Sequence, residues 1–282
     1  MAKQNVRKLN WVEQNLPEGL LVTADWLTRH GYSTSLRSQY VSAGWLDQPA
    51  RSVYMRPRTE LRWQQVVISL QTLLEFPVVV GGRTALELQG YAHFLRREQK
   101  EVHLYSNKSP PTWLLKLPMD VRFVFHKASR LFTSDLPTRG LADLNWNVRE
   151  RQRANEDPFS GDLVIQSWGQ WDWPLIVSTP ERAILELLDE LPHHESFHQV
   201  DKIMEGLVNL SPRRVQKLLE NCKSVKVKRL FFYFSDRHAH SWLKRIDRDQ
   251  VTLGKGKRML VRGGKLDPTY QITVPEDLDA VQ

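Results

Sequence analysis

Two histidines and a glutamate in the second half of the chain have the spacing of a zinc hydrolase. They are His194, Glu195 and His198 in the stretch "HESFH". On a helix, the H-E-x-x-H pattern places both imidazoles on one face and supplies the glutamate as a general base. Pro192 lies just upstream, which predicts that the motif sits at a polar helix start and not over a cleft. We therefore expect capping residues here, with no metal site and no catalysis.

The stretch "VVVGGRTALELQG" has the order strand, Gly81–Gly82 turn, helix, which is how nucleotidyltransferase-type proteins hold a triphosphate. That chemistry also requires paired carboxylates on the next strand, where they bind two metal ions. The next strand, "EVHLYS", offers Glu101 and His103 instead, and Arg83 stands where a small hydroxyl residue is expected. We predict a nucleotidyltransferase-like fold without the activity.

A pattern near the N-terminus is typical of DNA recognition. In "TADWLTRHGYSTSLRSQYVSAGWL" (23–46), Thr23 and Ser33 have the character of N-caps for two short helices, and Gly31 closes the first helix. The second helix of a helix-turn-helix presents its early residues to base edges. Here those residues all have side chains that can form hydrogen bonds, and none is acidic: Ser33, Thr34, Ser35, Arg37, Ser38 and Gln39.

Arginine pairs well with guanine and glutamine with adenine, so we predict that Arg37 and Gln39 read bases. Replacing Arg37 by alanine is then expected to remove sequence preference with little loss of folding. Phosphate contacts are expected from basic residues of the first helix and of the hairpin and linker that follow the second: Lys3, Arg7, Lys8, Arg51, Arg56 and Arg58. The alternatives are a winged helix that binds protein, or two packed helices with an exposed serine-rich face.

The overall charge favours a polyanionic partner without deciding the question. The 282 residues include 40 Lys and Arg against 32 Asp and Glu, a formal net charge of +8. The single cysteine excludes an internal disulfide framework and a cysteine-built zinc site. The sequence shows no apolar leader and no apolar run of membrane-spanning length, so we expect a cytoplasmic protein without cofactors or membrane contact.

The C-terminal part is clearly cationic. The glycine-rich stretch "LGKGKRML" (253–260) is not a phosphate loop, because it lacks the first glycine of that motif and has Arg258 after Lys257. Two interpretations of the basic residues stay open, a solvated face or a surface for an anionic partner such as RNA or DNA. The residues concerned are Lys223, Lys226, Lys228, Arg229, Lys255, Lys257 and Arg258.

Hydrophobic periodicity predicts an α+β fold that begins with a winged helix-turn-helix and continues as a larger mixed α/β region. We assign residues 1–60 to the winged helix and 61–282 to the second region, with a subdivision near 148–176 left open. In that region helices are expected at 61–75, 82–90, 179–191, 197–208, 212–220 and 224–238. Strands are expected at 77–80, 101–106 and 121–126, a surface loop at 148–162, and a strand, Gly-Gly turn and strand at 257–275.

The order of these motifs resembles AbiEi-family antitoxins of type IV toxin–antitoxin (abortive infection) systems. The resemblance rests on the N-terminal winged helix and on "GGRTALELQGY", "STPERAILELLDE", "SVKVKRLFF" and "GKRMLVRGGKLDPTYQITVP". It implies a non-enzymatic protein whose winged helix represses its own operon by binding inverted repeats at the promoter. It also implies that the C-terminal region counteracts a nucleotidyltransferase-like toxin encoded next to it, without a stable complex between the two proteins.

Two other classes of function compete with this one. A winged-helix transcription factor that responds to a ligand would require an apolar pocket and a small molecule that changes DNA binding. A divergent enzyme would use the Gly81–Gly82 turn or the His194–His198 motif, and would require metal-dependent turnover of nucleotides or peptides.

Overall fold

The N-terminal helices and strands follow the order of a winged helix. The computed structural model describes residues 2–57, 60–91, 100–133, 136, 161–170 and 172–279, with side chains from residue 8 onward. The elements are α1 (Ala2–Asn15), β1 (Leu21–Thr23), α2 (Ala24–Arg29), α3 (Thr34–Ser42), β2 (Asp47–Ala50) and β3 (Val53–Met55). The three strands form one antiparallel sheet in the order β1-β3-β2.

The expected helix boundaries of the helix-turn-helix are confirmed by their caps. The Thr23 hydroxyl accepts a hydrogen bond from the Trp26 amide at the start of α2, and Ser33 does the same for Leu36 in α3. Gly31 has a φ of +83°, the left-handed conformation that ends a helix with little strain in glycine. The expected hairpin is also present, and its first strand begins at Asp47.

The winged helix is joined to the rest of the chain by a continuous core. α4 (Trp63–Thr72) lies beside β1, and the amide of Leu21 donates to the hydroxyl of Ser69 at 2.7 Å. One cluster of buried apolar side chains runs from α1 through α4 into the helices that follow the second sheet. The predicted boundary near residue 60 thus falls between elements that share one hydrophobic core.

The second sheet is mixed and has five strands in the order β6-β5-β4-β8-β7. The strands are β4 (Val79–Val80), β5 (Glu101–Ser106), β6 (Arg122–Lys127), β7 (Leu163–Trp168) and β8 (Trp173–Ser178). β4 has only two residues. The Gln71 side chain of α4 adds hydrogen bonds beside it: its amide nitrogen donates to the carbonyls of Val78 and Ile176, and its amide oxygen accepts from the Ile176 amide. β7 and β8 form a hairpin that sequence periodicity did not predict.

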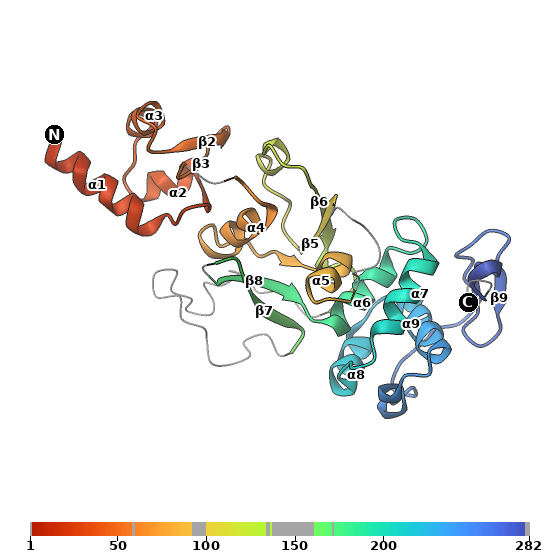
Figure 1. The fold of residues 1–282 in the computed structure, drawn as a ribbon. Helices are drawn as coiled ribbons and strands as arrows, with labels where there is room; N and C mark the ends of the chain where they lie inside the picture. Colours follow the sequence, from red (N-terminus) through yellow and green to blue (C-terminus); the bar gives the residue numbers. More distant parts are fainter. Residues whose placement is uncertain are drawn as a thin grey trace.

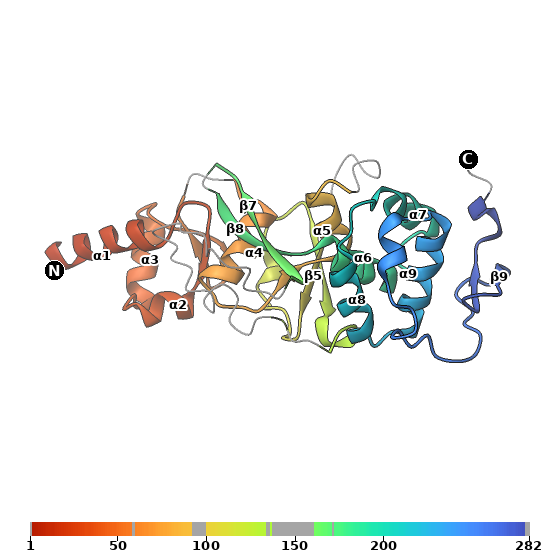
Figure 2. The same ribbon diagram turned by 90° about the horizontal axis from the view of Figure 1, so that it is seen from below.

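A group of helices packs beyond the sheet, and the expected helices of this region are confirmed. They are α5 (Gly82–Leu88), α6 (Pro180–Asp189), α7 (Phe197–Gly206), α8 (Pro212–Asn221) and α9 (Val225–Arg237). Thr179 and Pro180 begin α6 as the N-cap and first residue. In Figures 1 and 2 the winged helix lies at one end of the elongated molecule, the sheet in the middle, and the C-terminal hairpin at the opposite end.

The C-terminal hairpin differs from the expected one. Its strands are β9 (Lys265–Asp267) and β10 (Ile272–Val274), so the turn lies at residues 268–271 and the Gly-Gly pair precedes the first strand. A Cβ on Gly264 would lie 2.4 Å from the Val274 carbonyl oxygen, so this glycine permits close backbone packing. Much of the surface loop expected at 148–162 lies outside the described residues. Within the part that is described, none of the helices is both long and apolar enough to cross a membrane.

Candidate nucleic-acid interface

The exposed face of α3 carries most of the residues expected to contact bases. Thr34, Ser35, Ser38 and Gln39 are all exposed, whereas Tyr40 on the opposite face is fully buried. The Ser33 hydroxyl caps the helix, and the Thr34 hydroxyl accepts a hydrogen bond from Arg37 at 3.0 Å. Ser38 and Gln39 therefore remain the side chains best placed to pair with base edges, together with the exposed Ser35, whose hydroxyl lies 3.0 Å from that of Ser33.

Arg37 is the clearest correction to the sequence-based prediction. Its side chain is only 7% exposed, and its guanidinium lies inside the winged helix. It donates to the Thr28 hydroxyl at 2.8 Å and to the Tyr32 carbonyl at 2.6 Å, and it lies over the Tyr54 ring. A guanidinium held in this way is not available to guanine, so Arg37 positions α3 and is not a base-reading residue.

The first helix is attached to the turn between α2 and α3. The Lys8 ammonium donates to the Gly31 carbonyl at 2.6 Å, and the Tyr32 hydroxyl donates to the Lys8 carbonyl at 2.7 Å. The Trp11 and Trp26 rings pack against His30, with centroid separations of 4.8 and 4.2 Å. Lys8 thus has a structural role in addition to any phosphate contact.

The other expected phosphate contacts have mixed outcomes. Arg51 is exposed at the tip of the β2–β3 hairpin, where Ser52 has a left-handed φ of +64° and its carbonyl accepts from the Ala24 amide. The Arg56 guanidinium forms an ion pair with Glu18 at 3.0 Å, so it is already engaged within the protein. The side chains of Lys3 and Arg7, and all of Arg58, lie outside the described residues.

Three of the seven basic residues singled out in the C-terminal part do not form a free surface. Lys228 and Arg229 are only 7% and 3% exposed, and the Lys226 ammonium donates to the Asp189 and Leu191 carbonyls at the end of α6. A cation at this end of a helix stabilises the unpaired carbonyls and the negative end of the helix dipole. Lys223 is exposed but donates to the Ser129 carbonyl at 2.9 Å.

Arg229 instead shapes a basic loop at the far end of the molecule. Its guanidinium donates to the carbonyls of Leu253, Gly254 and Gly256 at 2.6–3.2 Å. It also donates to Gln271 at 3.3 Å. Burial lowers the pKa of Arg229, as does the nearby charge of Arg258. Residues 255–265 begin within the stretch held by Arg229 and end at the first residue of β9, and they expose five cations that we call the basic loop: Lys255, Lys257, Arg258, Arg262 and Lys265.

The zinc-like motif has a structural role. α7 begins at Phe197, so His194 precedes the helix while His198 lies within it, and the two do not share one helical face. Glu195 is buried and accepts from the Arg83 guanidinium through both of its oxygens, with Gln199 as a further acceptor. Among the residues that the structure describes, no three His, Cys, Asp or Glu side chains come together as a metal site.

The Gly81–Gly82 turn is filled by the protein itself. The Gly82 amide donates to the Glu186 carboxylate at 2.9 Å, in the place where a phosphate would be expected, and Glu186 is 0% exposed. A Cβ on Gly81 would lie 2.3 Å from that carboxylate and 2.5 Å from the Tyr105 ring. The two glycines therefore allow close packing of α5 against α6 and β5, and an internal anion occupies the helix start.

A chain of buried polar groups lies beside this turn. The Thr84 hydroxyl accepts from the His103 amide, His103 Nδ1 lies 3.0 Å from His126 Nε2, and His126 Nδ1 lies 3.1 Å from the Glu190 carboxylate. When both imidazoles are neutral and each carries its proton on Nδ1, His103 donates to His126 and His126 donates to Glu190. Burial, together with the charge of His126, lowers the pKa of His103 to about 4.

This depressed pKa predicts a loss of stability in mild acid. An unfolded chain protonates His103 near pH 6.5, whereas the folded protein resists protonation until about pH 4. The free energy of unfolding should therefore fall as the pH drops from 6.5 to 4, by on the order of 3 kcal/mol from this group. Denaturant unfolding of the wild type and of His103→Asn at several pH values measures the difference. Parallel pH profiles for the two proteins would contradict the prediction.

Comparison with known protein families decides the class of this chain. Residues 5–97 match the family model "Transcriptional regulator, AbiEi antitoxin N-terminal domain", and residues 165–275 match "Transcriptional regulator, AbiEi antitoxin, Type IV TA system". The chain belongs to the AbiEi antitoxin family. This family comprises transcriptional regulators and antitoxins of type IV systems and is not an enzyme family, so the interpretation as a divergent enzyme is set aside.

A solved structure shares the fold of this AbiEi-family chain. The Rv2827c protein from Mycobacterium tuberculosis is similar with a TM-score of 0.57 and 15% sequence identity, over 96% of this chain and 90% of that one. At this identity the likeness concerns the fold alone. No curated protein matches the sequence. The N-terminal family match extends to residue 97, past the winged helix and α4, in agreement with the core that joins them.

Proposed function

We propose that this AbiEi-family protein represses its own operon by binding inverted repeats at the promoter through α3 and the β2–β3 hairpin. The observation that carries the proposal is the exposed, acid-free face of Ser35, Ser38 and Gln39 on a helix that Arg37 fixes from inside. Amide and hydroxyl side chains on the second helix of such a motif suit the hydrogen-bonding groups of the major groove. Arg51, exposed on the hairpin, adds a phosphate contact.

Substitutions on this face should weaken promoter binding without unfolding the protein. We expect Ser38→Ala combined with Gln39→Ala to lower affinity for the chain's own promoter about tenfold or more, since each good base contact contributes about 1–3 kcal/mol. Mobility-shift titration measures the affinity, and thermal unfolding serves as the folding check. Gln14→Ala, an exposed amide on α1, is the matched control. Wild-type affinity in the double variant would remove this face from the proposal.

We further propose that the C-terminal region counteracts a nucleotidyltransferase-like toxin encoded next to this chain, without a stable complex between the two proteins. The basic loop supports this role, because Arg229 holds its backbone while five cations face solvent. A preformed cationic surface suits a polyanion such as RNA or DNA. The Gly81–Gly82 turn fits a nucleotidyltransferase-like ancestry whose phosphate position is now filled by Glu186.

Removing charge from the basic loop should separate neutralisation from repression. We expect the triple variant Lys255→Ala, Lys257→Ala and Arg258→Ala to fail to rescue growth when co-expressed with the neighbouring toxin gene. Its promoter affinity should stay within about threefold of wild type, because α3 is unchanged. Replacing Lys108, Lys116 and Lys127 by alanine removes the same charge from exposed positions elsewhere and should leave rescue intact. Full rescue by the loop variant would show that this loop is not the neutralising surface.

A transcription factor that responds to a ligand is the second candidate, and it would not require an adjacent toxin gene. Its supporting observation is a small hollow in the winged helix, lined by α1, the turn after α3 and the end of β3. If growth in the presence of the toxin does not depend on this protein while promoter binding is intact, only the interpretation as a transcriptional regulator remains.

A further inference from the structure

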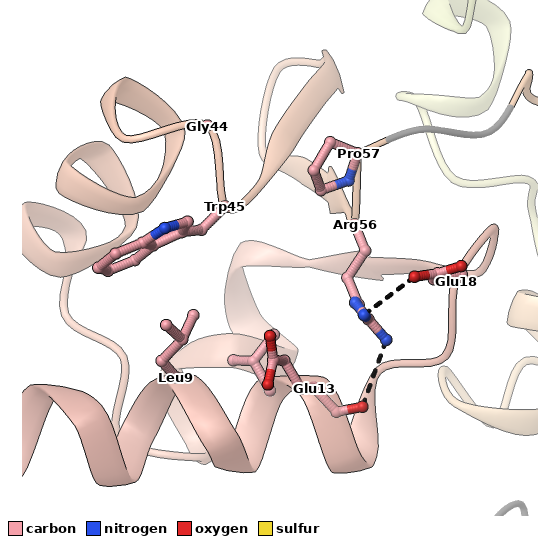
Figure 3. Close-up of a pocket in the computed structure, with 8 residues that line it drawn as sticks. Leu9, Glu13, Glu18, Gly44, Trp45, Arg56 and Pro57 are labelled. Atoms are coloured by element: carbon pink, nitrogen blue, oxygen red, sulfur yellow. Dashed lines mark hydrogen bonds and ion pairs between the residues drawn. The ribbon is translucent and has the colours of Figure 1, made fainter.

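The hollow in the winged helix is bounded by three segments that are separate in sequence. It encloses about 160 Å³, many times the 10–15 Å³ that one water requires and well below the roughly 300–1,000 Å³ of sites for drug-sized ligands. It lies apart from the DNA-contacting residues of the proposed function, which are Ser35, Ser38, Gln39 and Arg51. Figure 3 shows the lining residues: Leu9, Val12, Glu13, Glu18, Gly44, Trp45, Arg56 and Pro57.

One side of the hollow is apolar and aromatic. Leu9 of α1 lies across from the Trp45 ring (Figure 3), and Val12 of the same helix also lines the hollow. Trp45 is 42% exposed, which is unusual for a large aromatic side chain in this protein. Its ring is nonetheless fixed, because it packs edge-on against the buried Tyr40 with a centroid separation of 5.1 Å and an interplanar angle of 79°. A fixed, accessible indole face attracts alkyl groups and cations.

The other side of the hollow has an excess of negative charge. The Arg56 guanidinium is already engaged, since it pairs with Glu18 at 3.0 Å and donates to the Glu13 carbonyl at 3.4 Å. The Glu13 carboxylate points into the hollow between Leu9 and Arg56 (Figure 3), and within the described residues it has no hydrogen bond or ion pair. Among the lining residues, two carboxylates stand against one guanidinium, and this net negative charge disfavours anions and favours a cation.

We infer that this hollow binds a small organic cation, a primary ammonium group on a short alkyl stem. The stem lies against Leu9, Val12 and the Trp45 ring, and the ammonium pairs with the Glu13 carboxylate. Because α1, the turn after α3 and the end of β3 all line the hollow, a bound ligand contacts α1 together with the segments that follow α3 and β3.

The inference is tested by calorimetric titration of the full chain with n-butylamine at constant ionic strength. We expect saturable binding that n-butanol and butyrate do not reproduce, since one lacks the charge and the other reverses it. Glu13→Gln and Trp45→Ala should each weaken binding tenfold or more, and Glu60→Gln, an exposed carboxylate outside the hollow, should leave it unchanged. If Trp45→Ala fails to fold, Trp45→Leu replaces it in the test, beside Glu13→Gln.

Three results would overturn the inference: no binding of n-butylamine, equal binding of n-butanol, or wild-type binding by Glu13→Gln. A free amine and a lysine side chain share the chemistry, so 1,4-diaminobutane and Nα-acetyl-lysine amide are compared as well. Tighter binding of the diamine assigns a free amine, and tighter binding of the lysine amide assigns a protein side chain. The titration requires no promoter DNA, so its failure is distinguishable from a failure of the proposed repression.

Discussion

Arg37→Ala is expected to destabilise the winged helix and, as a consequence, to weaken promoter binding. The substitution leaves the Tyr32 carbonyl without its 2.6 Å donor and removes the side-chain connection between α2 and α3. Loss of a buried, charged hydrogen-bonding group should lower the free energy of unfolding by about 2–4 kcal/mol. Denaturant unfolding and mobility-shift titration of the same preparations measure both effects.

Two comparisons separate this role from base reading. Arg37→Lys keeps the charge but loses the planar fork, so its stability should lie between those of wild type and Arg37→Ala. The variant with Ser38→Ala and Gln39→Ala should show the opposite behaviour, with weakened promoter binding and wild-type stability. If Arg37→Ala instead keeps wild-type stability and loses only its sequence preference, Arg37 reads a base after all and our assignment is wrong.

The second large effect is expected at the ion pair between Arg83 and Glu195. Both side chains are nearly inaccessible, 6% and 4% exposed, and they join the start of α5 to the segment that leads into α7. Glu195→Gln leaves the Arg83 charge buried without its counter-charge, which should reduce the free energy of unfolding by about 3–5 kcal/mol. Denaturant unfolding measures the loss.

The control is the exposed pair between Lys202 and Glu205, with side chains 60% and 56% exposed. Glu205→Gln should change stability by less than about 1 kcal/mol, because solvent screens such pairs. The double variant Arg83→Met and Glu195→Leu should be more stable than Glu195→Gln, since no charge is then left buried without a partner. Equal stability of Glu195→Gln and wild type would contradict this assignment.

Local signals predicted much of the fold. The caps at Thr23 and Ser33 and the glycine after α2 are read from short-range chemistry, and each one was found where expected. The helix expected at 224–238 was also found, as α9. The β7–β8 hairpin, in which Trp168 and Trp173 are partners across the two strands, was not predicted.

The candidate site was less predictable, because burial of a charged side chain depends on contacts with other elements of the fold, which local sequence patterns do not show. Nothing near Arg37 indicates that Thr28 and the Tyr32 carbonyl surround it, and nothing near Arg229 indicates that carbonyls some 25 residues later accept its hydrogen bonds. Residue type alone therefore predicted surface contacts for Arg37 and Arg229, whereas both side chains form hydrogen bonds inside the protein. The exposed serines and Gln39 of α3 were correctly placed because helical spacing sets which face they occupy.

The core shared by the winged helix and α4 has a consequence for how the protein is removed from a cell. Elements with a common core tend to unfold as one cooperative unit, so a protease that captures the unfolded chain would destroy both of its proposed activities in the same event. Turnover would then lift repression at the moment when protection is lost. New synthesis would begin as the old supply is degraded, and the operon would replenish the protein without a separate sensor.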